Sequence, residues 1–292
     1  MNLKSRGEKI FDVCNIIFMC ILMIFFIYPF IDRLWFSFMN KENASQMGLR
    51  LFPKFPLVFD AYKEVFESKT FFIALANSVY RTVLGTVLTV FVTFFAGYAL
   101  SKKTLPFRKV ITVMILFTMF FSGGTVPTYI TIKDLGLLNT RWALILPLAT
   151  SAWYVVIARN FLSTIPASLE ESAMVDGAGV FRTLFQIVFP ISKPIIAVIS
   201  LWSAIRHWNA WFDAMIYTTK NELMVLQQLL RRILIENEAS AMGDALMRPS
   251  SATTPETVKA ATIVVTVLPI VCVYPFFQKY FVKGINVGAV KG

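Results

Sequence analysis

The sequence has little charge and few reactive side chains. Only 15% of its 292 residues are Asp, Glu, Lys or Arg, and it contains three cysteines and one histidine, His207. Soluble globular domains carry about 25% charged residues. The low charge, together with 57% hydrophobic residues and a mean hydropathy of +0.65, therefore excludes a soluble globular protein and predicts a membrane protein.

Catalytic and nucleotide-binding motifs are also absent from the sequence. His207 is not part of an H-E-x-x-H motif, no G-x-S-x-G elbow is present, and no G-x-x-x-x-G-K-[ST] loop can bind nucleotide phosphates. Cys14, Cys20 and Cys272 lie in or beside apolar segments without metal-ligand spacing. We therefore expect this chain to have no catalytic residues, no bound cofactor and no metal.

Six long segments lack Asp and Glu entirely. They cover residues 13–31, 82–101, 110–132, 142–158, 194–212 and 260–278. An α-helix needs about 20 residues to cross a hydrocarbon core about 30 Å thick. The segments predict an all-α polytopic membrane protein with six transmembrane helices, in a single domain over residues 1–292. A secondary transporter would need a carboxylate inside a span to couple to protons or sodium, and none is present.

Basic residues between the spans predict the orientation of the chain. Residues 102–109 include four Lys or Arg and no acid, and the tail carries Lys279, Lys283 and Lys291. Since basic residues in short loops stay on the cytoplasmic side, both termini and the loop around Glu171 are expected inside. Residues 33–81 and 213–258 are expected outside. The net charge of +11 then reflects topology and lipid contact rather than nucleic-acid binding.

The loop between the fourth and fifth spans has the most informative local pattern. Pro166 precedes a short amphipathic segment in which Ser168 and Glu171 match an S-x-x-E capping box. Gly177 can end that helix, because glycine adopts the left-handed conformation at low cost, and a second helix is expected from about Val180. The expected apolar stripe comprises Leu169, Ala173 and Met174. Such a projecting helix can fit a groove on a partner and transmit a rigid-body movement.

The fifth span ends in polar and aromatic residues. Trp202, Arg206 and Asn209 share one helical face, and ionisable groups near a span are costly unless they face water, a partner or the interface. Rings beside amide and guanidinium donors suit sugars, although an aromatic belt with Arg206 reaching outward is the alternative. The candidate substrate-path residues are Asn77, Trp153, Trp202, Arg206, His207, Trp208 and Asn209.

Residues 222–241 form a further helical pattern with one apolar face. The segment is too short and too charged for a seventh span. We expect a helix on the outer surface that either covers the bundle or helps receive a binding protein.

The spacing in the loop resembles a known family. Glu171-Ser172-Ala173, then Gly177, then Ile187-Val188-Phe189-Pro190 resemble the EAA loop of ABC-transporter permeases, with Ser172 in place of an alanine and Phe189 in place of a leucine. From about residue 70 onward the chain is similar to the MalG-type carbohydrate permeases. The similar segments are Asn77-Ser78, Gly97-Tyr98-Ala99-Leu100-Ser101, Gly136-Leu137-Leu138-Asn139-Thr140, Arg159-Asn160-Phe161, Asp176-Gly177-Ala178 and Trp208-Asn209.

The resemblance implies a type I ABC importer permease in the bacterial cytoplasmic membrane, with residues 70–285 as the family core. It also implies four partner chains, namely a second related permease, two ATPase subunits that hold ATP and Mg, and an extracytoplasmic solute-binding protein. Residues 166–190 would be the coupling loop that docks on the ATPase, and Trp202 and Asn209 would lie in the helix that lines the sugar path. The coupling-loop residues are Glu170, Glu171, Ser172, Ala173, Asp176, Gly177, Ala178 and Pro190.

The chain looks most like the LplC-type branch, which is associated with complex oligosaccharides, including uronate-containing ones. Arg206 could hold a carboxylate through two parallel hydrogen bonds. We therefore expect an oligosaccharide importer that works by alternating access and favours acidic sugars. The alternatives are a permease for polyamine, phosphate or amino acid, and, from another class, a secondary transporter.

Overall fold

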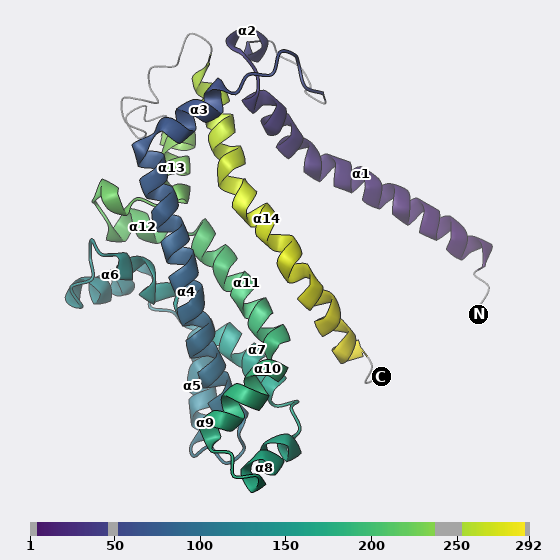
Figure 1. The fold of residues 1–292 in the computed structure, drawn as a ribbon, viewed down its shortest axis with the longest axis vertical. Helices are drawn as coiled ribbons and strands as arrows, with labels where there is room; N and C mark the ends of the chain where they lie inside the picture. Colours follow the sequence, from purple (N-terminus) through teal and green to yellow (C-terminus); the bar gives the residue numbers. More distant parts are fainter. Residues whose placement is uncertain (1–4, 46–51, 237–252, 290–292) are drawn as a thin grey trace. The chain divides into compact units, whose positions relative to one another are not determined.

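Helices make up most of the chain that the structure describes. The computed structural model describes residues 5–45, 52–236 and 253–289, and these residues contain no β-strand (Figure 1). Long apolar runs form helices because a helix satisfies its backbone hydrogen bonds internally, as lipid requires. The all-α prediction is confirmed for this part of the chain.

The chain forms two compact units. One comprises residues 1–71 and 230–268, and the other comprises residues 72–229 and 269–292. The single domain expected from the sequence stays a prediction.

The first unit contains a long exposed helix. Its elements are α1 (Arg6–Ser37), α2 (Lys41–Ala44), α3 (Asp60–Glu67), η5 (Arg232–Glu236) and the first part of α14 (Pro255–Ala289). A capping box starts α1, since the Glu8 amide donates to Ser5 Oγ at 3.2 Å and the Ser5 amide donates to the Glu8 carboxylate at 2.7 Å. The most apolar 18-residue window of α1 has no buried residue. A helix apolar on all sides suits lipid or a partner subunit.

The C-terminal end of α1 makes apolar and polar contacts within the first unit. Phe36 and Met39 pack on Ala260, and the Ser37 and Tyr62 hydroxyls lie 2.6 Å apart. Burial raises the pKa of the Tyr62 hydroxyl, and the hydrogen bond to Ser37 partly opposes that shift. The end of α1, helix α3 and the start of α14 therefore share one small core.

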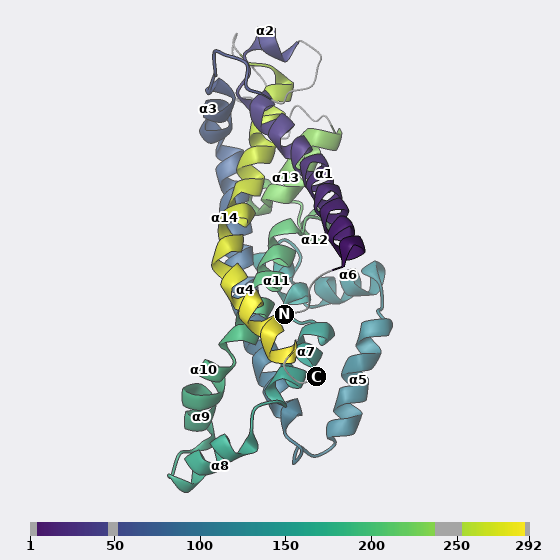
Figure 2. The ribbon, with the colours of Figure 1, turned by 90° about the vertical axis from the view of Figure 1, so that its right-hand side faces the viewer.

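The second unit contains most of α4 and the helices that follow it. Its elements are α4 (Lys69–Ser101), α5 (Arg108–Phe120), α6 (Thr125–Asp134), η1 (Arg141–Leu144), η2 (Leu146–Leu148), α7 (Ala152–Leu162), α8 (Ala167–Val175), α9 (Val180–Thr183), η3 (Leu184–Val188), α10 (Phe189–Ile191), α11 (Lys193–Asn209), α12 (Phe212–Tyr217), η4 (Asn221–Leu223), α13 (Leu226–Arg231) and the end of α14. Figures 1 and 2 show α8 beyond one end of α4, with α12 and α13 toward its other end.

Three helices are long and apolar enough to cross a membrane, and three bent pairs raise the number to as many as six. The long helices are Gly7–Ser37, Lys69–Ser101 and Pro255–Val273. The bends are 115° between α5 and α6, 50° between η1–η2 and α7, and 75° between α9–α10 and α11. The segment 110–132, expected as one span, is divided at Gly124, whose φ is +82°. The number of six spans stays a prediction.

A core holds α4, α7 and α11 together in the second unit. Its buried residues are Phe94, Tyr154, Ala158, Leu162, Leu184, Val188, Ile195 and Ile199. At Gly97 a Cβ atom would lie 2.8 Å from the Ala158 Cβ and 3.1 Å from the Arg159 amide nitrogen. Glycine is therefore what allows α4 and α7 to cross this closely.

Candidate functional site

The helix expected to project from the bundle is α8, but it starts differently from the prediction. Pro166 is the residue before its first turn, and no side chain caps that end. The predicted Ser168–Glu171 capping box is wrong, because Ser168 already lies inside the helix and is not at the capping position.

The predicted end of α8 is confirmed. Gly177 has a φ of +81°, and the chain turns through paired hydrogen bonds. The Ala178 amide donates to the Ala173 carbonyl at 2.9 Å, and the Gly177 amide donates to the Met174 carbonyl at 3.0 Å. Helix α9 then starts at Val180, as the sequence predicted.

Most of the surface of α8 is exposed. Glu170 and Ala173 are its only buried residues, whereas Leu169 and Met174 are 43% and 50% exposed. Two of the three residues of the expected apolar stripe, Leu169 and Met174, therefore face outward beside the exposed residues Glu171, Ser172 and Asp176, whereas Ala173 packs inward. Such a surface offers both apolar area and charge to a partner.

Glu170 connects α8 to the end of α4. The Tyr98 hydroxyl donates to the Glu170 carboxylate at 2.9 Å, and Lys102 forms an ion pair with that carboxylate. A cavity of about 830 Å³ lies beside this contact, between the 98–104 and 162–180 segments. Residues 102–104 and α8 therefore lie at one end of the second unit.

The chain is bent where α10 meets α11. Leu184–Val188 forms a π-helix, Pro190 is exposed in α10, and Ser192 separates α10 from α11. Pro194 stands in the first turn of α11, where the missing amide hydrogen costs nothing. The coupling-loop residues thus lie along α8, the Gly177 turn and α10, and they do not converge on one point.

The structure separates the candidate path residues of α11 into two groups. Trp202 is partly buried and stacks on Tyr154, with ring centroids 6.0 Å apart, while Arg206 and Asn209 are exposed. The Asn209 side chain donates to the Ile205 carbonyl at 3.0 Å. Trp202, Arg206 and Asn209 remain the accessible candidates on this helix.

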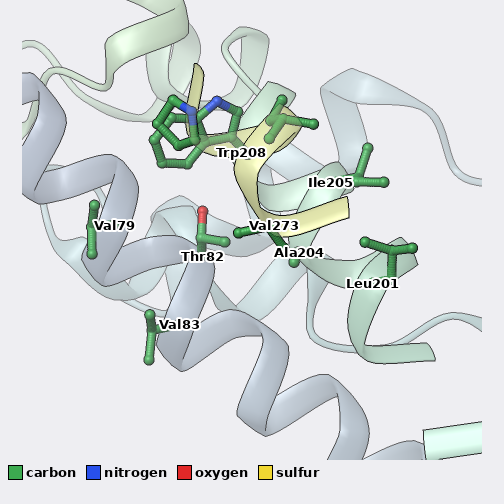
Figure 3. Close-up of a pocket in the computed structure, with 10 residues that line it drawn as sticks. Val79, Thr82, Val83, Leu201, Ala204, Ile205, Trp208 and Val273 are labelled. Carbon is green, nitrogen blue, oxygen red and sulfur yellow. The ribbon is translucent and has the colours of Figure 1, made fainter. Parts of the chain in front are cut away.

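His207 and Trp208 are buried. A Cβ atom at Gly85 would lie 2.4 Å from the His207 ring, so that ring packs directly on the backbone of α4. Trp208 lines a small apolar pocket of about 160 Å³, together with Val79 and Val83 of α4 and Ile205 of α11 (Figure 3). Neither side chain is presented to water. Trp153, by contrast, is 53% exposed on α7.

Asn77 holds a loop together. Its amide donates to the Glu222 carbonyl at 2.7 Å and to the Met224 carbonyl at 3.0 Å. The neighbouring Ser78 hydroxyl accepts from the Leu226 amide at 2.8 Å. Both side chains are buried, so they position the start of α13.

The segment predicted as one surface helix over residues 222–241 is different in the structure. A 3₁₀ turn, α13 and a π-helix follow one another up to Glu236, and residues 237–241 lie outside the described part. Leu223, Leu226 and Leu229 are buried. The apolar face therefore packs into the chain, and a single regular surface helix is not formed.

Sequence reasoning missed Arg81. Its side chain is 1% exposed, forms an ion pair with Asp213 and donates to the Ala210 carbonyl at 3.1 Å. The available signal was a basic residue directly before the uncharged segment 82–101. Within the described residues, no group of three or more His, Cys, Asp or Glu could hold a metal.

Long apolar helices and bent helix pairs are typical of a multi-pass membrane protein, and the exposed helix α8 offers a surface to a partner. The chain belongs to the family described as the inner membrane component of binding-protein-dependent transport systems, whose profile matches residues 71–287. The resemblance derived from the loop pattern is confirmed.

Two relatives from Bacillus subtilis (strain 168) are similar along nearly the whole chain. Protein LplC is 39% identical over 99% of this chain and 97% of its own length. The polygalacturonan/rhamnogalacturonan transport system permease protein YtcP is also 39% identical, over 98% of this chain and 99% of its own.

Solved structures give the same fold. One chain in the crystal structure of a bacterial ABC transporter involved in the import of the acidic polysaccharide alginate is 33% identical, with a TM-score of 0.89 over 96% of this chain and 100% of that one. A chain of a bacterial alginate ABC transporter in complex with an alginate pentasaccharide-bound periplasmic protein has a TM-score of 0.59 at 15% identity, which bears on the fold alone.

Proposed function

We propose that this chain is the permease subunit of an ATP-driven importer for oligosaccharides, with acidic ones favoured. The observation that carries the proposal is the 39% identity, over 98% of this chain, to a permease for polygalacturonan and rhamnogalacturonan. The solved structure with a TM-score of 0.89 belongs to an importer of another acidic polysaccharide, alginate. This chain would form the path, and ATP would be hydrolysed by separate subunits.

The proposed assembly contains a second related permease, two ATPase subunits and an extracytoplasmic solute-binding protein. The exposed apolar residues Leu169 and Met174, beside the exposed carboxylate of Glu171, support a docking role for α8. Its contact with residues 102–104 supports a cytoplasmic position, since that segment is rich in basic residues. Both termini are then cytoplasmic, and closure of the ATPase pair would drive alternating access.

The substrate preference is assigned to the exposed face of α11. Arg206 offers a charged fork of donors that matches a carboxylate, while Trp202 and Asn209 offer a ring and an amide. A guanidinium pairs with a uronate and gains less from a neutral sugar. Acidic oligosaccharides are therefore the first candidates, and neutral ones are the second.

Uptake by the full transporter tests this assignment. We expect Arg206→Gln to lower uptake of an acidic oligosaccharide by about tenfold, which corresponds to about 1.4 kcal/mol, and to change uptake of a neutral one of equal length by less than about twofold. Trp202→Ala and Asn209→Ala should lower both. Lys220→Gln removes another exposed cation, in the loop after α12, and serves as the matched control.

Two results would contradict the assignment. If Arg206→Gln lowers the uptake of acidic and neutral sugars equally, Arg206 does not bind the sugar carboxylate. Normal uptake in both Trp202→Ala and Asn209→Ala would place the sugar path away from α11.

A further inference from the structure

Two neighbouring carboxylates in α8 have different surroundings. Glu170 is 8% exposed, whereas Glu171 lies on the exposed surface of the helix. Successive residues of an α-helix point about 100° apart. One carboxylate can therefore face the rest of the chain while the other faces outward.

Glu170 is enclosed by two groups from a single neighbouring segment. The Tyr98 hydroxyl donates to it at 2.9 Å, and the Lys102 ammonium pairs with both of its oxygens. That ammonium also lies 4.5 Å from the centroid of the Tyr98 ring. The three side chains therefore form a cluster in which a buried carboxylate has both charge and hydrogen-bond partners.

The cluster joins two elements that are far apart in the sequence. Tyr98 lies in the last turn of α4, Lys102 follows the end of that helix, and Glu170 lies in the first turn of α8. The cavity of about 830 Å³ lies beside the cluster, so side-chain packing between α4 and α8 is incomplete there. The polar cluster is therefore a principal contact on this side of α8.

The opposite part of α4 has its own set of polar contacts. Asn77, Ser78 and Arg81 hold the chain from Ala210 to Leu226 through hydrogen bonds and an ion pair. Helix α4 is continuous from Lys69 to Ser101. A displacement of α8 that moves α4 would thus also reach α12 and the start of α13.

We propose that Tyr98, Lys102 and Glu170 are positioning residues that fasten α8 to α4 and pass the movement of α8 along that helix. The proposal rests on the proposed function of α8 as the helix that docks on the ATPase. It assigns Glu170 to a contact within this chain and leaves Glu171 to the partner. The residues expected to dock on the ATPase would therefore have two different roles, one within this chain and one toward the partner.

Cross-linking of the purified chain tests the contact without any partner. Cys14, Cys20 and Cys272 are first replaced by serine. A short bifunctional thiol reagent should then join the cysteines of Lys102→Cys/Glu170→Cys, and it should join those of Lys102→Cys/Asp176→Cys far less, because Asp176 lies at the other end of α8. Equal cross-linking in both pairs would overturn the contact.

Transport by the assembled complex tests the positioning role. Glu170→Gln and Lys102→Met should keep the ATPase bound and hydrolysing ATP, while the amount of sugar imported per ATP falls by about tenfold, a typical coupling factor. Exchange of the two charges in Lys102→Glu/Glu170→Lys should restore most of the loss. Lys103→Met, an exposed neighbour, is the matched control, and Glu171→Gln should instead reduce co-purification of the ATPase.

Different results would contradict the positioning role and the proposed function. Release of the ATPase by Glu170→Gln, with no recovery in the exchange variant, would make Glu170 a docking residue and overturn the proposal. Unchanged sugar import per ATP in both single variants would overturn it as well. If the unaltered chain binds no ATPase subunit at all, the proposed function fails, and the cross-linking result still decides whether the contact exists.

Discussion

Gly177 has a backbone conformation that few other residues adopt at low cost. Its φ is +81°, and no atom lies within 4 Å of the position that a Cβ would occupy. The restriction therefore comes from the backbone and not from crowding. A substitution at this position therefore strains only the backbone of the turn between α8 and α9.

We expect Gly177→Val to leave membrane insertion intact and to lower uptake by about tenfold, because a β-branched residue in this conformation costs about 1–3 kcal/mol. Gly179→Val is the matched control, since that glycine has a φ of −69° and equally open space. Uptake and ATP hydrolysis are measured in the reconstituted complex. Identical behaviour of the two variants would show that the left-handed turn is not needed for coupling.

At the scale of the element, α4 is held by buried polar contacts as well as by apolar packing. Arg81 is 1% exposed and pairs with Asp213 after α11. Removal of one partner of a buried pair leaves an unpaired charge, whereas removal of both does not. The pair therefore links α4 to the first turn of α12.

Arg81→Met should destabilise the purified chain by about 3–5 kcal/mol, because the Asp213 carboxylate loses its partner. The double variant Arg81→Met/Asp213→Asn should recover a large part of that loss. Arg141→Met is a control at a more exposed arginine, which lies over the Tyr80 ring and should cost about 1 kcal/mol or less. Thermal unfolding in detergent measures all three, and a double variant no more stable than Arg81→Met would contradict this account.

At the scale of the whole molecule, the side of the membrane on which each loop lies is predicted from the segments found at the same end of the second unit. Thr104 and Glu171 line the same cavity, whereas Asn77 contacts the loop at Glu222. The basic segment 102–109 predicts that the end with the cavity is cytoplasmic. The orientation expected from the sequence stays a prediction until labelling tests it.

After replacement of the native cysteines, Thr104→Cys and Ser172→Cys should react with an impermeant thiol reagent only from the cytoplasmic side. Asn221→Cys, which lies in the exposed segment after α12, should react only from the outside. Asn237, in the same segment that is expected outside, lies beyond the described residues. Reaction of positions 104 and 221 from the same side would refute the proposed orientation.

Local features were predictable because they depend on neighbouring residues. The turn at Gly177 and the start of α9 at Val180 follow from backbone preference. The capping box at Ser168 failed for a local reason too, since Pro166 already ends the preceding loop and the helix begins one residue later. The adjacent glycines Gly123 and Gly124 favour a break at this point, but they do not predict the 115° bend between α5 and α6.

The sequence by itself determined that the chain is helical and apolar and that one loop carries a projecting helix, because hydrophobicity and backbone preference are properties of short segments. Only the tertiary structure decided which polar groups meet. Arg81 and Asp213 are 132 residues apart, and Lys102 and Glu170 are 68 apart. Such partners depend on how helices pack, and several partners fit the same local pattern. For that reason the sequence does not show that Asp213 pairs with Arg81 rather than with another basic residue.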